Sequence, residues 1–207
     1  VTSRPRHVFP QIADGRFADG SGYITSFTIT NVSSGPTFCS ITLGGLSQNR
    51  LPRSSVTIPP GGFSLITTTN LSPFTQGYAA VSCSQWVTAT ATYGFVSSRG
   101  RTLGMATVFS SQTATVGQLV VVQGDGVRTG LAVVNDSMFS QRYEFRLADQ
   151  SGNILDVRTV TMPSGGHLSR FVDELLNVPP GFFVGALSVL GAGGFNAIGL
   201  FHDGEVF

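Results

Sequence analysis

A seven-residue sequence that occurs twice constrains this chain more than any other feature. Residues 56–62 read VTIPPGG and residues 160–166 read VTMPSGG, so the two copies differ only at their third and fifth positions. The same offset of 104 residues places Asn31 on Asn135 without a gap. An internal repeat of this kind indicates that one structural unit has been duplicated. The chain of 207 residues is therefore predicted to form two domains of about 100 residues each.

The hydrophobic pattern within each half predicts strands. Residues 23–31 alternate large or apolar side chains with hydroxyl side chains, which is the period of a half-buried strand. Similar runs follow at intervals of about 8–12 residues with Gly, Pro, Asn or Ser between them, as in an all-β sandwich or barrel. One short helix is expected at residues 172–177, before two prolines. The other strands are predicted at 37–43, 54–58, 63–67, 77–82, 87–96, 101–108, 115–123, 127–135, 142–148, 154–161, 167–171, 182–190 and 195–201.

Charge is scarce and unevenly divided. Only 11% of the residues are charged, less than half the usual ~25%, and lysine is absent, which excludes chemistry that needs a lysine nucleophile. Residues 1–107 hold seven Arg and two acidic residues, a formal charge of +5, whereas residues 108–207 hold five Arg and nine acidic residues, a formal charge of −4. This division favours head-to-tail contact between copies of the chain, although drift after duplication is an equal alternative. The Arg residues are scattered, so no nucleic-acid partner is expected.

Both cysteines, Cys39 and Cys83, lie in the first half, and Tyr143 occupies the position in the second half that corresponds to Cys39. A pair confined to one copy predicts a disulfide, with two buried thiols as the alternative. Their spacing does not suit a metal site, and no cofactor is expected. No apolar run is long enough to span a membrane. The start at Val1 rather than Met fits a mature product after removal of a signal peptide, although another origin of this start is an equal alternative.

The first nine residues are predicted to form an extended N-terminal arm. Pro5 within them argues against a central strand. The second copy contains nothing that matches residues 104–109, which end in Val-Phe, and the arm ends in the same pair. We hypothesise that the arm of one molecule adds a strand to the second domain of a neighbour. Alternatively, the shared pair is a coincidence. The assembly residues of the arm would be Val1, Arg4, Arg6, Val8 and Phe9.

No catalytic constellation is evident, and the chain is predicted not to be an enzyme. His7, His167 and His202 share no short motif. The adjacent acids Asp173 and Glu174 are better explained by the start of the predicted helix than by glycosidase chemistry. The loop at residues 14–22 resembles a calcium loop only superficially, because the spacing of its acids is wrong, and a turn is favoured.

Two features suggest ligands or modification outside the assembly hypothesis. Trp86, in a predicted short connection, is the most plausible exposed aromatic residue for a glycan surface, although packing in the core or a hairpin is favoured. Three segments match the N-glycosylation pattern, but Asn is also the natural turn residue at these places. These possible acceptors are Asn31, Asn70 and Asn135.

Several motifs together resemble a known family. They are FPQIADG at residues 9–15, the strand that ends at Asn31, the turn at 56–62, and YGF at 93–95 matched by IGL at 198–200. The chain resembles the immunoglobulin-like β-sandwich repeats of secreted and surface proteins of environmental bacteria. This resemblance covers nearly the whole chain and implies a fold and an extracellular location, but no activity.

The sequence therefore predicts an all-β chain of two tandem immunoglobulin-like β-sandwich domains. The arm would be residues 1–9, the first domain 10–109 and the second domain 110–207. The expected function is that of an extracellular structural subunit at the bacterial cell surface that joins copies of itself into a filament or pilus-like fibre. The alternative is a monomeric adhesin or carbohydrate-binding module that contacts surface glycans near Trp86 or residues 14–22.

Overall fold

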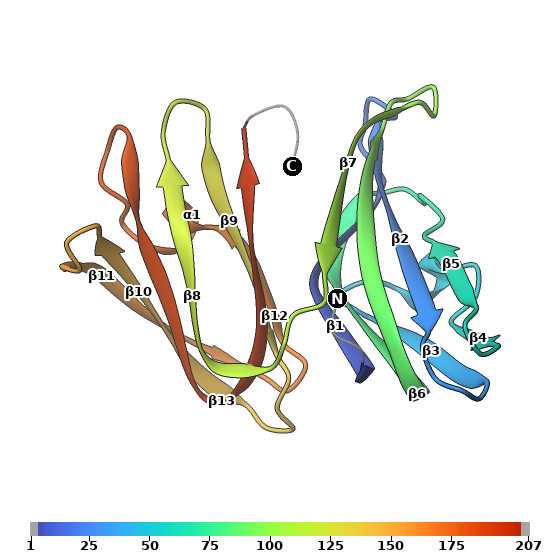
Figure 1. Cartoon of the computed structure of the whole chain (residues 1–207). Coiled ribbons are helices and arrows are strands. Elements are labelled where there is room, and N and C mark those ends of the chain that lie inside the picture. The colour runs from blue at the N-terminus through green and yellow to red at the C-terminus, as the bar shows by residue number, and fades with distance from the viewer. Residues whose placement is uncertain (1–3, 204–207) are drawn as a thin grey trace. The chain divides into compact units, whose positions relative to one another are not determined.

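A computed structural model describes residues 4–203 of the chain. The chain divides into two compact units, of which unit 1 ends at Ser111 and unit 2 begins at Gln112 (Figure 1). Both units are built almost entirely from antiparallel strands, so the prediction of an all-β chain is confirmed.

Unit 1 contains seven strands, which join in one curled sheet with the order β4-β3-β6-β1-β2-β5, and β7 also pairs with β6. A short 3-10 helix at Gln48–Arg50 connects β3 to β4. The strands are β1 (Arg4–Arg16), β2 (Gly22–Asn31), β3 (Thr37–Gly44), β4 (Ser55–Ile58), β5 (Phe63–Thr67), β6 (Thr75–Val96) and β7 (Thr102–Phe109).

The long strand β6 organises unit 1. Residues 77–82 and 87–96 were predicted as separate strands, but they belong to one strand of 22 residues. Val87 pairs with Arg4 of β1 and with Asn31 of β2, so these two strands lie on opposite edges of β6. β1 and then β7 follow one edge of β6, while β3 and then β2 follow the other.

Unit 2 repeats this arrangement around β13. β10 and β8 pair with the first half of β13, and β9 pairs with its second half. The predicted helix is present but shorter than expected. The elements are β8 (Ala114–Gln123), β9 (Arg128–Asn135), β10 (Gln141–Asp149), β11 (Ile154–Met162), β12 (His167–Phe171), α1 (Val172–Leu175) and β13 (Phe183–His202).

The duplicated Pro-Gly-Gly segment forms the same turn in both units. In unit 1, the Asn31 N–H donates to the Gly62 carbonyl at 2.9 Å, and the Gly61 N–H donates to the Asn31 carbonyl at 3.1 Å. Gly61 has φ = 68°, a left-handed conformation that favours glycine. Asn135 makes the equivalent two bonds in unit 2, at 2.9 and 3.0 Å. The repeat therefore marks a turn that is tied to the end of a neighbouring strand.

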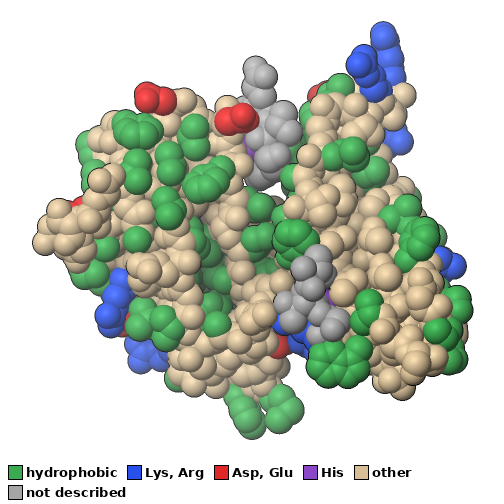
Figure 2. Space-filling view, in the orientation of Figure 1, with side chains coloured by type: hydrophobic (Ala, Val, Ile, Leu, Met, Phe, Trp, Pro, Cys, Tyr) green, Lys and Arg blue, Asp and Glu red, His purple; other side chains and the backbone are tan. Residues whose placement is uncertain are grey.

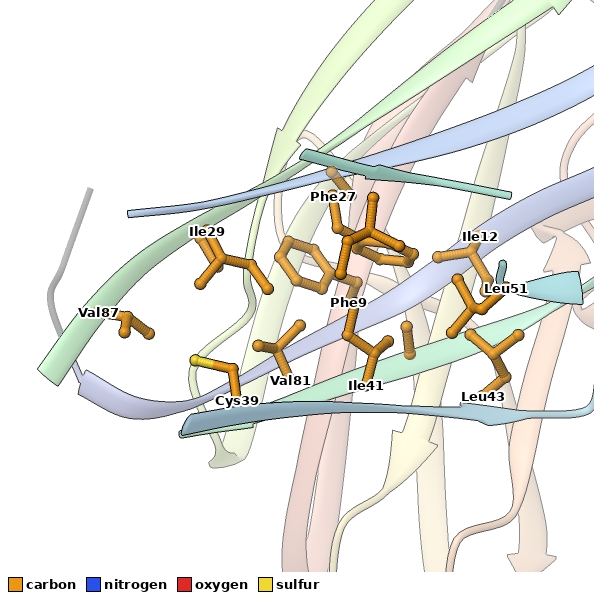
Figure 3. Close-up of a cluster of buried hydrophobic side chains, with 14 of the residues drawn as sticks. Phe9, Ile12, Phe27, Ile29, Cys39, Ile41, Leu43, Leu51, Val81 and Val87 are labelled. Carbon is orange, nitrogen blue, oxygen red and sulfur yellow. The ribbon is translucent and has the colours of Figure 1, made fainter. Parts of the chain in front are cut away.

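Alternating apolar side chains of these strands form one core in each unit. Phe9, Ile12 and Phe27 are fully buried in the core of unit 1, and Figure 3 shows their side chains gathered between the strands. In unit 2, the rings of Tyr143 and Phe195 meet edge to face, with centroids 5.7 Å apart. The two separate cores explain why the chain divides into two units.

Candidate assembly surfaces

The N-terminal segment lies in the sheet of unit 1 and does not extend from it as an arm. Arg6, Val8 and Phe9 pair with Ser82, Ala80 and Ala79 of β6 in the same chain. Val8 is 3% exposed and Phe9 is fully buried. The Phe9 side chain belongs to the core of unit 1, which corrects the expected separation of residues 1–9 from the first domain. Val1, which was also predicted to take part in assembly, lies outside the described residues.

A polar cluster ties β1 to the segment that follows β7. The Arg4 Nη2 atom donates to the Ser110 hydroxyl at 2.7 Å and to the Ser111 carbonyl at 2.8 Å. The Nε2 atom of His7 faces the carbonyls of Arg4 and Val87, so this nitrogen donates, and Nδ1 accepts from the Ser110 hydroxyl at 2.7 Å. Burial lowers the pKa of His7 below its ordinary value. Burial therefore favours the neutral form of the imidazole, and sequence patterns gave no sign of this cluster because His7 and Ser110 are 103 residues apart.

The predicted disulfide is present in unit 1. Cys39 and Cys83 lie directly opposite each other on β3 and β6, and they are bonded. In unit 2, the same pair of positions holds Tyr143 and Gly191. A Cβ on Gly191 would lie 2.6 Å from the Tyr143 ring, so this glycine makes room for the aromatic ring. Packing of a large side chain over a glycine therefore replaces the covalent bond of unit 1.

Two of the possible glycosylation acceptors are buried within turns. Asn31 and Asn135 are fully buried, and the amide nitrogen of each donates to three backbone carbonyls at 2.8–3.1 Å. The side-chain oxygen of each accepts bonds from the serine two residues later. Their amides are therefore not accessible for a glycan in this fold. Asn70 has a left-handed φ of 54°, and its N–H donates to the Asp14 carboxylate at 2.9 Å.

Of the residues considered for an alternative ligand surface, Trp86 is exposed and Asp14 is buried. Trp86 lies within β6 and is 57% exposed, so it is not part of the core. Phe38 on β3 is 55% exposed. Asp14, from the loop considered for ligands, is fully buried, and its Oδ2 lies 2.8 Å from the Arg50 Nη1. This ion pair was not anticipated from sequence, and it removes Asp14 from any ligand surface.

The acidic pair at the start of the helix belongs to a surface ion cluster. Asp173 and Glu174 lie in the first turn of α1, and both accept bonds from Arg128, at 2.7 and 3.3 Å. The Arg128 guanidinium lies 3.8 Å from the centroid of the Phe171 ring. These hydrogen bonds raise the pKa of Arg128. Both carboxylates are thus engaged with one arginine, which links α1 to β9.

The outer face of β5, β2, β6 and β7 is uncharged. Strand registers place hydroxyl side chains in its centre and large apolar side chains at its two borders. Phe63 and Leu65 are 71% and 55% exposed at one border, and Met105 and Phe109 are 72% and 61% exposed at the other. Figure 2 likewise shows uncharged side chains over most of the visible surface. The rows run Thr67–Ser26–Thr92–Thr107, Leu65–Thr28–Thr90–Phe109 and Phe63–Thr30–Thr88.

Among residues 4–203, no group of three or more His, Cys, Asp or Glu side chains is placed to hold a metal ion. No helix in the described part of the chain is long and apolar enough to cross a membrane.

Comparisons with known proteins identify no family. No protein-family model and no curated protein matches the chain. Among solved structures, that of the infectious bursal disease virus Gx strain is 9% identical, with a TM-score of 0.21 over 99% of this chain and 74% of the other. The VP2 subviral particle of the same virus is 12% identical, with a TM-score of 0.21 over 99% of this chain and 72% of the other. Likeness at this level carries no argument about fold or function.

Proposed function

We propose that this chain is an extracellular structural subunit that associates with copies of itself, head to tail, into a surface filament. The observation that carries the proposal is the uncharged outer face of unit 1, bordered by exposed Phe63, Leu65, Met105 and Phe109. Large exposed apolar side chains that gather on one face are typical of protein–protein contacts. The two units are proposed to be immunoglobulin-like domains.

The division of charge supports contact between unlike units. Unit 1 carries seven Arg and two acidic residues, and unit 2 carries five Arg and nine acidic residues. Opposite net charges steer a basic unit of one copy toward an acidic unit of another. The disulfide of unit 1 supports an oxidising, extracellular location. The proposal does not use β1 as a donated strand, because Phe9 would have to leave its own core.

The proposal is tested by the mass of the purified chain. Light scattering after size-exclusion chromatography, at concentrations rising a hundredfold, should show a mass that grows with concentration, and electron microscopy should show filaments. Association should weaken at high salt, because salt screens the attraction between unlike charges. A strict monomer at every concentration would refute the proposal.

Binding of surface glycans is a second candidate, because Trp86 is 57% exposed on β6. An exposed indole ring can stack on the apolar face of a sugar, as amphipathic aromatic rings do at interfaces. A glycan array should then show a signal that Trp86→Ala abolishes and Phe38→Ala retains. An equal signal from the unaltered chain and Trp86→Ala would argue against this candidate.

A further inference from the structure

The two units share one arrangement of strands but differ along one edge of their central strand. In unit 1, β7 pairs with the second half of β6, from Thr90 to Val96. In unit 2, the second half of β13 pairs with β9 along one edge. Along the other edge, from Ile198 to Phe201, no strand within residues 4–203 occupies the place that β7 takes in unit 1.

Strand registers define which residues correspond. Tyr93 of β6 pairs with Thr25 of β2, and Phe201 of β13 pairs with Thr129 of β9. Thr25 and Thr129 are themselves equivalent, because each hydroxyl bonds to both the N–H and the carbonyl of one residue in the preceding strand. Phe201 is therefore the counterpart of Tyr93.

Burial at these counterparts shows the effect of the difference. Tyr93 is 5% exposed, whereas Phe201 is 53% exposed. Two residues earlier on the same face, Ala91 is fully buried, whereas its counterpart Gly199 is exposed. In unit 1, Ala106 and Val108 of β7 pack against the core on this side. The inward face at the end of β13 lacks that cover among the described residues.

Unit 1 carries a strand edge that is longer than this gap, because β7 has eight residues and the gap covers residues 198–201. Within the described residues, β7 pairs with β6 alone, so its other edge is available for pairing. Leu103, Met105 and Phe109 on β7 are each more than half exposed. An edge strand with free backbone groups and exposed apolar side chains is a template for pairing with another chain.

We propose that β7 of one copy pairs with the edge of β13 at residues 198–201 in a second copy. This inference deepens the proposed function, on which it rests, by naming the two edges that meet. Main-chain hydrogen bonds provide affinity in this mode of strand addition. The occupant is a second copy because β7 belongs to the basic unit and β13 to the acidic unit, so the charges of the two units attract. Each copy presents both edges, and the contact therefore propagates.

Two variants, each blocked at one edge, test the pairing. Phe201→Lys places a charge at the receiving edge, and the double variant Met105→Lys, Phe109→Lys places charges on the donated strand. Lysines on edge strands oppose such pairing. Each variant alone should remain monomeric at concentrations where the unaltered chain associates. A mixture of the two should form a one-to-one dimer that grows no further, because only one productive junction remains.

The control variant is Phe38→Lys. Phe38 is 55% exposed on β3, which pairs with β4 and β6, so this change replaces an exposed apolar side chain of unit 1 without touching either proposed edge or the outer face of β5, β2, β6 and β7. It should leave association unchanged within about twofold, while each edge variant weakens association at least about tenfold. Circular dichroism confirms that each variant is folded.

A synthetic peptide with the sequence of residues 102–109 tests the same edge without altering the protein. The peptide should shorten or dissolve assemblies of the unaltered chain, and a scrambled peptide should not. If the unaltered chain associates but both edge variants still polymerise and the peptide has no effect, the edge pairing is wrong and the proposed function stands. If the unaltered chain is always monomeric, both fail together.

Discussion

Replacement of Asp14 should test how unit 1 is held together. The Asp14 side chain is fully buried and that of Arg50 is 9% exposed. Besides its 2.8 Å contact with Asp14, the guanidinium donates to the carbonyls of Leu71 at 2.7 Å and Pro73 at 2.8 Å. The second carboxylate oxygen accepts the Asn70 N–H at 2.9 Å. The ion pair thus joins the end of β1 to the 3-10 helix, and the other hydrogen bonds of the two side chains reach the loop that leads into β6.

The magnitude follows from what Asp14→Ala leaves behind. Removing one partner of a buried ion pair costs about 3–5 kcal/mol, because the other charge stays buried without compensation. Arg50 keeps its carbonyl partners, which places this loss near the lower end of the range. The Asn70 N–H loses its acceptor, at a cost of about 1 kcal/mol or more. We expect the free energy of unfolding of unit 1 to fall by about 4 kcal/mol.

Urea unfolding followed by tryptophan fluorescence measures this loss, because Trp86, the only tryptophan, reports on unit 1. The control is Glu144→Ala in unit 2, which breaks an exposed pair with Arg146 and should cost less than about 1 kcal/mol by circular dichroism. A loss below about 1 kcal/mol for Asp14→Ala would refute the reasoning. In the double variant Asp14→Ala, Arg50→Met, the loss should be smaller than the sum of the single losses by about 1–3 kcal/mol.

Three further predictions concern other contacts. Gly191→Ala places a Cβ within 2.6 Å of the Tyr143 ring and should destabilise unit 2 by about 1–3 kcal/mol in thermal unfolding. The control is Gly130→Ala, whose Cβ would lie 3.5 Å from its nearest neighbour, the Leu200 carbonyl oxygen, and which should cost less than about 1 kcal/mol. Replacing both Cys39 and Cys83 by Ala removes the disulfide that closes a loop with a sequence separation of 44. The lower entropy of the cross-linked unfolded chain predicts that the free energy of unfolding of unit 1 falls by about 4 kcal/mol. An unchanged urea midpoint by fluorescence would contradict this. Burial lowers the pKa of His7, so the unfolded chain binds a proton at this residue more readily than the folded chain does. The free energy of unfolding of unit 1 should therefore fall as the pH drops below 6.5, the ordinary pKa of histidine. Above that pH, His7 should not change the free energy of unfolding. Urea titrations from about pH 8 to pH 5 test this expectation, and greater stability at the acidic end would contradict it.

The repeat could be found from sequence because few residue types satisfy the hydrogen bonds and the backbone conformation of its turn. Asn31 and Asn135 must bind three carbonyls, and the glycine that follows Pro60 or Ser164 must take a positive φ, so these residues persisted in both copies. Alternating side chains predicted most strands for a similar reason, since each strand has one buried face.

The offset of 104 residues did not extend to the central strands. Asn31 pairs with Val87 and Asn135 pairs with Phe195, so β6 and β13 correspond at an offset of 108. The match between YGF at 93–95 and IGL at 198–200 was therefore wrong in register, and Phe201 takes the place of Tyr93. The additional residues fall between β12 and β13, where unit 2 contains α1. A local pattern cannot detect such an insertion when the flanking strands share so few identities.

Contacts between distant segments could not be predicted either. Val8 and Phe9 were expected to bind a neighbouring molecule because an apolar pair near a terminus looks the same whether it is buried in its own core or another. Val8 pairs with Ala80 and Phe9 pairs with Ala79 of β6, 72 and 70 residues later, and this pairing decides between these possibilities. The Arg50–Asp14 contact spans 36 residues and leaves no local signature.

The central position of β6 has a consequence for the order of folding. β1, β2, β3 and β7 all pair with β6, yet all except β7 precede it in the sequence. During synthesis or export from the N-terminus, β1, β2 and β3 therefore emerge before β6, with which they pair. Phe9 and Phe27 stay exposed until β6 has emerged. Pairings of such long range are slow to form. Unit 1 should thus acquire protection from proteases in a single late step, once the chain has emerged as far as Val96, the end of β6. Before that step, its many Ser and Thr residues keep the unfolded chain polar.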